Sequence, residues 1–154
     1  MGLVDLQQRP IYQIATDNAG KPQYYVNGIR VEFTQALPAY DAATANWGYP
    51  WRMPTDDEIS ELINKCTWTL TTKNGVTGFL VKSKTNGNTI FLPAGGYMAT
   101  NPQHQGIFGY YWSSTLYLMD NNGSQMSTEL HFTSKPFVAG FNRCVGCLVR
   151  PVYP

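Results

Sequence analysis

The spacing of apolar and polar positions predicts two short helices in the first half of the chain and mostly short strands after them. In the clearer helix, Ile59, Leu62 and Ile63 recur at the i, i+3 and i+4 spacing of a helix with one buried face. Thr55 followed three residues later by Glu58 is a capping-box pattern, in which each side chain satisfies a free backbone amide. We therefore expect this helix to begin directly after Thr55 and to end near residues 65 and 66.

A second helix is predicted upstream, over residues 38–47. Pro38 would stand in its first turn, the interior is rich in alanine, and Gly48 follows the last turn, where glycine often ends a helix.

Runs of alternating apolar residues separated by turn sequences predict the strands. The pair Asn27-Gly28 is typical of a tight hairpin turn, and residues 73–75 and 85–88 predict two more turns. Residues 98–109 are expected to form a long loop and residues 120–123 a turn. Helices packed on an irregular antiparallel sheet make an α+β domain. The expected strands are 11–14, 24–26, 29–33, 68–72, 79–81, 90–92, 129–132 and 148–152.

Composition narrows the classes of function. Only 14% of the 154 residues are charged and the net charge is +1, which disfavours a basic nucleic-acid surface. No apolar run is long enough to span a bilayer, and the first five residues lack the pattern of a signal peptide. Three cysteines, an odd number, argue against a scaffold held by disulfides alone, and we expect Cys66 to be a small buried apolar residue.

Four segments stand in order along the chain: WRMPT (51–55), IFLPAGGY (90–97), YWSST (111–115) and VRPV (149–152). Together they resemble the Fibrobacter succinogenes major paralogous domain family, over roughly residues 35 to 154. That family is similar to formylglycine-generating enzymes and to C-type lectin-like domains, so the resemblance implies a C-type lectin-like fold with two short helices. We accordingly expect one domain over residues 1–154, with strands and a hairpin in 1–34 and the family-like region in 35–154. The resemblance extends to two further segments, CTWT (66–69) and KTNGN (84–88).

These segments also make sense as framework. Trp51, Tyr97 and Trp112 can each bury a large aromatic surface, and the serine pair at 113–114 can bond backbone groups in a loop-rich core. We expect Arg150 to be held by carboxylate or carbonyl groups.

The enzyme hypothesis would use the oxidase chemistry of the formylglycine-generating relatives, which needs a cysteine pair. Cys144 and Cys147 invite that comparison, but the surrounding motif of those enzymes is not visible. A disulfide between them would need a tight turn at Gly146, because extended chain separates their α-carbons by about 10 Å. His104 and His131 are the only histidines, and no second cysteine pair completes a zinc site. We expect no enzyme activity, no catalytic residue, no metal and no cofactor.

Calcium-dependent sugar binding is equally unsupported. The Glu-Pro-Asn and Trp-Asn-Asp motifs of calcium-binding lectins are absent, and Asp120, Asn121 and Asn122 are first of all a turn sequence.

The apolar and aromatic residues of the C-terminal half that fit neither a turn nor an alternating core are the predicted ligand surface. The alternative is that half or more of them are ordinary core. They are Ile107, Phe108, Tyr110, Leu116, Tyr117, Leu118, Met119, Phe137, Val138, Phe141, Cys144, Val145 and Cys147.

The same fold is used by variable proteins of diversity-generating retroelements, whose C-terminal segments are mutated while framework codons stay fixed. The stretch from Arg143 to Cys147 resembles such a pattern, with Arg143 and Gly146 fixed and the sites between them varied. The resemblance implies a binding domain on a bacterial cell surface, secreted, or on a phage particle, and a protein or glycan partner on another cell or particle. A structural surface or pilus-tip module and a formylglycine-type oxidase are the alternatives.

Overall fold

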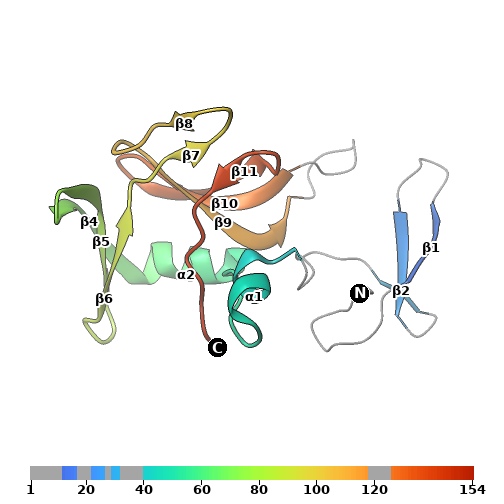
Figure 1. The fold of residues 1–154 in the computed structure, drawn as a ribbon. Helices are drawn as coiled ribbons and strands as arrows, with labels where there is room; N and C mark the ends of the chain where they lie inside the picture. The colour runs from blue at the N-terminus through green and yellow to red at the C-terminus, as the bar shows by residue number, and fades with distance from the viewer. Residues whose placement is uncertain (1–11, 17–21, 27–28, 32–39, 118–125) are drawn as a thin grey trace.

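The computed structural model describes residues 12–16, 22–26, 29–31, 40–117 and 126–154. Two helices and mostly antiparallel sheets make up this part of the chain, so the expected α+β class is confirmed at that level (Figure 1). The helices are α1 (Ala42–Trp47) and α2 (Asp56–Lys65). The sheets, in strand order, are β1 (Tyr12–Thr16), β2 (Pro22–Val26) and β3 (Ile29–Val31); β4 (Cys66–Lys73), β5 (Val76–Ser83) and β6 (Thr89–Pro93); β11 (Pro136–Asn142), β10 (Met126–Phe132) and β9 (Gly109–Leu116); and β12 (Gly146–Cys147), β7 (Tyr97–Met98) and β8 (Pro102–Gln103).

Helix α2 begins and ends where its sequence predicts. The Thr55 side chain accepts a hydrogen bond from the Glu58 amide at 3.3 Å, and the Glu58 carboxylate accepts one from the Thr55 amide at 2.9 Å, which completes the capping box. The helix ends at Lys65, and β4 starts with Cys66, a half-buried residue that packs against the core.

Helix α1 begins four positions later than predicted. Its N-cap is Asp41, whose carboxylate accepts hydrogen bonds from the Ala43 and Thr44 amides, each at 2.9 Å. An aspartate that satisfies free amides sets the helix start more strongly than the fixed backbone of a proline does. Pro38 itself lies outside the described residues. The predicted end is confirmed, with Gly48 at the C-cap and a φ of 76°.

Two of the three predicted hairpin turns lie within the described part of the chain. Asn74 and Gly75 connect β4 to β5 with φ values of 49° and 79°, which is the backbone geometry of a tight hairpin turn. In the next hairpin Phe79 pairs with Leu92, both buried, so the predicted buried face is confirmed. Residues 27, 28 and 120–123 lie outside the described residues.

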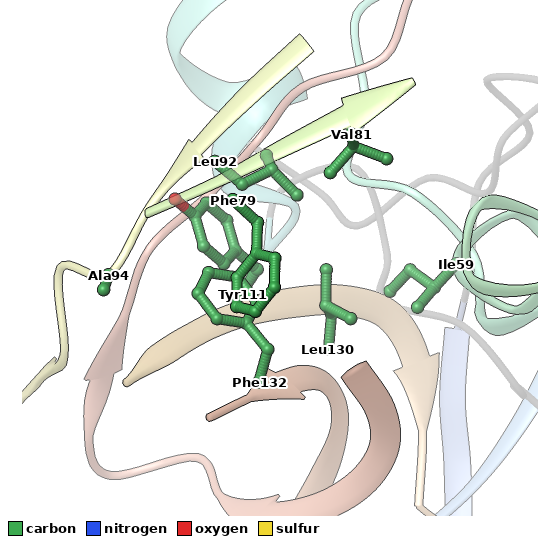
Figure 2. Packing of buried hydrophobic residues seen from close by; sticks show 8 residues of the cluster. All are labelled: Ile59, Phe79, Val81, Leu92, Ala94, Tyr111, Leu130 and Phe132. Atoms are coloured by element: carbon green, nitrogen blue, oxygen red, sulfur yellow. The ribbon is translucent and has the colours of Figure 1, made fainter. Parts of the chain in front are cut away.

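The hydrophobic core lies between α2 and the sheets β4–β6 and β9–β11 (Figure 2). Ile59 enters from α2, Phe79 and Val81 from β5, and Leu130 and Phe132 from β10. The rings of Phe79 and Phe132 meet edge to face with centroids 5.2 Å apart, a favoured arrangement that fixes how the sheets pack.

The predicted strand at residues 148–152 is replaced by two isolated bridges. Leu148 pairs in parallel with Tyr111, and Val152 pairs antiparallel with Arg52. The two bridges have different partners, one in β9 and one in the 51–55 segment, and Pro151 between them has no amide to donate, so no continuous ladder forms. The end of the chain is nevertheless fastened to the 51–55 segment, because Arg52 and Val152 exchange backbone hydrogen bonds at 3.2 and 2.9 Å.

The framework predictions hold only in part. The Ser114 hydroxyl donates to the Pro54 carbonyl at 3.3 Å, as expected for a serine bonding backbone in the core. Trp51 is not buried, since 37% of its surface is exposed. The prediction for Arg150 was wrong: the residue is exposed, and its guanidinium makes no hydrogen bond or ion pair with any residue the structure describes. Arg52 is the arginine held by a carboxylate, that of Glu58.

Candidate ligand surface

The sheet β9–β10–β11 presents two different faces because side chains alternate along each strand. Its inner face carries Tyr111 and Leu130, which pair across the strands and belong to the core. Its outer face carries Tyr110, Glu129 and His131, of which His131 pairs with Tyr110. The predicted ligand surface therefore has to be judged by which face each residue occupies.

Aromatic rings fill the outer face and continue onto the small sheet β12–β7–β8, which lies above it in Figure 1. Tyr110 is at the centre, with ring centroids 5.0 Å from Tyr97, 5.4 Å from Phe141 and 4.4 Å from His131. Such edge-to-face and offset-stacked pairs are favourable and rigid. We call this set the aromatic cluster: Tyr97, His104, Phe108, Tyr110, Trp112, His131, Phe137 and Phe141.

The aromatic cluster changes from buried to exposed toward one end of the sheet. Tyr110 is only 5% exposed, whereas Phe137 at the start of β11 is 48% exposed and Ile107, just before β9, is 62% exposed. The His131 ring stacks on the Phe137 ring with centroids 4.7 Å apart, and its centroid lies 5.9 Å from that of the Phe108 ring. We call Ile107, Phe108, His131 and Phe137 the apolar rim.

A buried carboxylate lies beneath this rim. Glu129 is 1% exposed, its Oε1 lies 3.3 Å from His131 Nδ1, and its Oε2 has no hydrogen-bond partner among the described residues. Burial raises the pKa of Glu129 to about 8, because a buried carboxylate without a nearby cation is unfavourable. Burial lowers the pKa of His131, and the nearby His104 lowers it further. Both shifts favour the uncharged form of each group at neutral pH.

One cysteine of this region, Cys147, is poorly suited to redox chemistry. Cys147 is half-buried, and burial together with Glu129 raises its thiol pKa to about 12, so the reactive thiolate is scarce at neutral pH. Cys144 is exposed, and both are free thiols in the structure. Burial also raises the pKa of Tyr110, whose hydroxyl lies 3.2 Å from His104 Nδ1.

The structure brings together part of the predicted ligand surface. Phe108, Tyr110, Phe137 and Phe141 belong to the aromatic cluster, and Ile107 borders it. Cys147 pairs with Tyr97 across β12 and β7.

The other predicted residues that the structure describes are not among the aromatic cluster as defined above. Val138 is on the inner face of the sheet, packed against the core. Leu116 ends β9, and the ring of Tyr117 lies against Gly140 of β11. Cys144 and Val145 lie in the segment between β11 and β12, where the Val145 amide donates to the Asn142 carbonyl at 3.2 Å. Leu118 and Met119 lie outside the described residues.

Sequence reasoning missed the polar members of the site. Glu129 and His131 stand two positions apart in a predicted strand, which places both on one face, and this spacing was the available signal. Tyr97 and Trp112 had been interpreted only as framework.

Among the described residues, no group of three or more His, Cys, Asp or Glu side chains is arranged to hold a metal ion. Neither α1 nor α2 has the length and apolar character needed to cross a bilayer. Comparison with protein-family models, with curated proteins and with solved structures finds no match for this chain.

Proposed function

We propose that this chain is a non-enzymatic, C-type lectin-like ligand-binding domain whose ligand surface is centred on the apolar rim. The observation that carries the proposal is that Phe137 is 48% exposed while its ring stacks on His131 in the aromatic cluster, and that Ile107, next to Phe108 in the chain, is 62% exposed. Exposed apolar residues over a well-packed base are typical of binding sites, since the base holds the contact residues in place and so lowers the entropic cost of binding.

The chemistry of the rim favours a protein or glycan partner. Large aromatic side chains dominate the affinity of many interfaces, and their rings bury much area with few rotatable bonds. The uncharged His131 adds a polar group at the middle of the rim. The partner would be carried by another cell or particle, and the domain would be displayed on a cell surface, secreted, or on a phage particle.

Diversification by a retroelement is a further part of this proposal. Cys144 is exposed, Val145 and Cys147 are half-buried, and all three lie within or beside the segment joining β11 to β12. A segment there can change sequence while β10 and β11 keep their pairing. If the surrounding genome encodes neither a reverse transcriptase nor a near-repeat of the C-terminal coding segment, this part of the proposal fails.

The binding hypothesis is tested with matched surface variants. Phe137→Ser and Ile107→Ser remove apolar contacts from the rim, whereas Leu70→Ser and Val76→Ser remove equally exposed residues, at 59% and 47%, from the β4–β5 hairpin. Each protein would be applied to a glycan array and to bacterial cells, and bound protein would be quantified.

We expect saturable binding that falls about tenfold in the rim variants, a loss typical of interface residues worth more than about 1 kcal/mol, and stays unchanged in the hairpin variants. If the rim variants and the hairpin variants lose binding equally, or if no protein binds at all, the binding proposal is wrong and the alternative of a structural surface module remains. Copper-dependent oxygen consumption that disappears in Cys144→Ser and Cys147→Ser would instead favour an oxidase.

A further inference from the structure

A second candidate site lies on the inner side of the sheet, away from the apolar rim. It is a cavity of about 270 Å³ between α2, β6, β9, β10 and the end of the chain. Tyr111 and Leu130 line it, whereas Tyr110 and Glu129 lie on the other face of the same strands. Nothing in the proposed ligand surface therefore depends on this cavity.

The walls of the cavity are almost entirely apolar. Ile59 and Leu62 line it from α2, Leu92 from β6 and Leu130 from β10. Figure 2 labels three of these lining residues, with Leu92 and Leu130 on different strands and Ile59 on the helix. Small-molecule sites are typically of this kind, a concave apolar space with a few polar groups at defined places.

Two charged residues also line the cavity, and only one of them is neutralised. The two oxygens of the Glu58 carboxylate accept hydrogen bonds from the Arg52 guanidinium at 2.6 and 2.7 Å, so that charge is balanced within the protein. Arg150 has no hydrogen-bond or ion-pair partner among the described residues and is exposed. Arg150 is itself a lining residue of the cavity, and its charge opposes the rise that burial causes in the pKa of Tyr111, which also lines it.

From this combination we infer that the cavity binds a small aliphatic monocarboxylate, with the chain among the leucine and isoleucine side chains and the carboxylate on Arg150. An arginine fork matches a carboxylate in geometry as well as in charge. The size agrees: a cavity of about 150 Å³ accepts benzene, so about 270 Å³ accepts roughly ten non-hydrogen atoms. Octanoate is a straight-chain carboxylate of that size.

The experiment uses the full chain and three probes with the same chain length: octanoate, 1-octanol and octylamine. Binding would be followed by the NMR methyl signals of Ile59, Leu62, Leu92 and Leu130, with Leu70 and Val76 as distant reference signals. We expect saturable shifts of the cavity methyls with octanoate, at least about tenfold weaker binding of 1-octanol, and no binding of octylamine.

Two variants separate the head-group contact from the apolar wall. Arg150→Gln should weaken octanoate about tenfold or more and leave 1-octanol unchanged, whereas Lys73→Gln, which removes an exposed charge from the β4–β5 hairpin, should change neither. Leu62→Trp, at a half-buried wall position, should weaken both ligands by filling the space. The inference is overturned if millimolar octanoate shifts no cavity methyl, if 1-octanol binds as well as octanoate, or if Arg150→Gln has no effect. None of these results bears on the apolar rim.

Discussion

The Asp41 carboxylate accepts hydrogen bonds from the Met53 amide, twelve residues further along the chain, at 2.9 and 3.1 Å. The same carboxylate caps α1 through Ala43 and Thr44. Asp41 and Met53 are both buried, so these contacts are shielded from water. One side chain thus determines where α1 begins and where the 51–55 segment passes.

Replacing Asp41 by alanine should cost about 2–4 kcal/mol of unfolding free energy, because it removes a helix cap and leaves the buried Met53 amide without a partner. Urea unfolding measures the change. Asp57→Ala removes an exposed acidic residue from the first turn of α2 and should cost less than about 1 kcal/mol. Equal losses in the two variants would show that the Asp41 contacts contribute little.

The contact between Arg52 and Glu58 should make the protein sensitive to acid. The hydrogen bonds from Arg52 hold the pKa of Glu58 at about 2, against an ordinary value of 4.5. A carboxylate with a depressed pKa stabilises the fold above pH 4.5, and this contribution is lost as the pH falls from 4.5 toward 2. Because 39% of the Glu58 side chain is exposed, solvent screening limits the contribution to about 1–2 kcal/mol.

Glu58→Gln should therefore flatten the dependence of unfolding free energy on pH between 4.5 and 2. The matched control is Glu61→Gln in the same helix, which breaks only an exposed pair with Lys65. If the two variants follow the same pH curve, Glu58 is not the group responsible.

The fold was predictable where its determinants are local. The capping box at Thr55 and Glu58 and the turn at Asn74 and Gly75 each lie within a few residues and are correct in the structure. Strand β11 was not predicted, since its sequence Pro136–Asn142 contains no regular alternation and its partner is β10. Its existence depends on pairing, which single-residue patterns do not contain.

The site was predictable in composition but not in arrangement. Phe137 and Val138 are consecutive apolar residues, yet Phe137 is exposed in the apolar rim and Val138 packs against the core. Tyr110 and Tyr111 divide between the two faces in the same way. A shift of one residue in register would exchange these roles, so only the pairing of β9, β10 and β11 decides which residues can meet a ligand.

Gly109 tests the close contact between β9 and β10. A β-carbon at this position would lie 2.0 Å from the Phe132 ring, which is fully buried and cannot move aside. Gly109→Ala should cost about 1–3 kcal/mol or more through overpacking. Gly146→Ala, where the nearest atom is the Met98 β-carbon at 3.2 Å, should cost less in the same urea unfolding experiment. A larger loss for Gly146→Ala would contradict the packing described here.

Glu129 should make the protein less stable as the pH rises toward 8. Its pKa is about 8 in the folded protein and about 4.5 when unfolded, so the native state holds the proton more tightly and stability falls between these values. His131 has the opposite effect at lower pH, because its pKa is lowered from 6.5 and its protonation favours the unfolded chain. Between pH 6.5 and 8 the unfolded chain loses only the rest of the His131 proton, a rise of at most about 0.4 kcal/mol, so the larger fall due to Glu129 dominates.

In that window the wild type should lose about 1–2 kcal/mol of unfolding free energy, whereas Glu129→Gln should stay nearly level because its side chain does not ionise. Urea unfolding at pH 6.5, 7 and 8 would compare the two proteins, with Glu61→Gln expected to follow the wild type. A wild type that is level across the window, or a Glu129→Gln protein that falls as steeply, would mean that Glu129 is already ionised at neutral pH. The apolar rim would then lie above a negative charge and would favour a cationic partner over a neutral one.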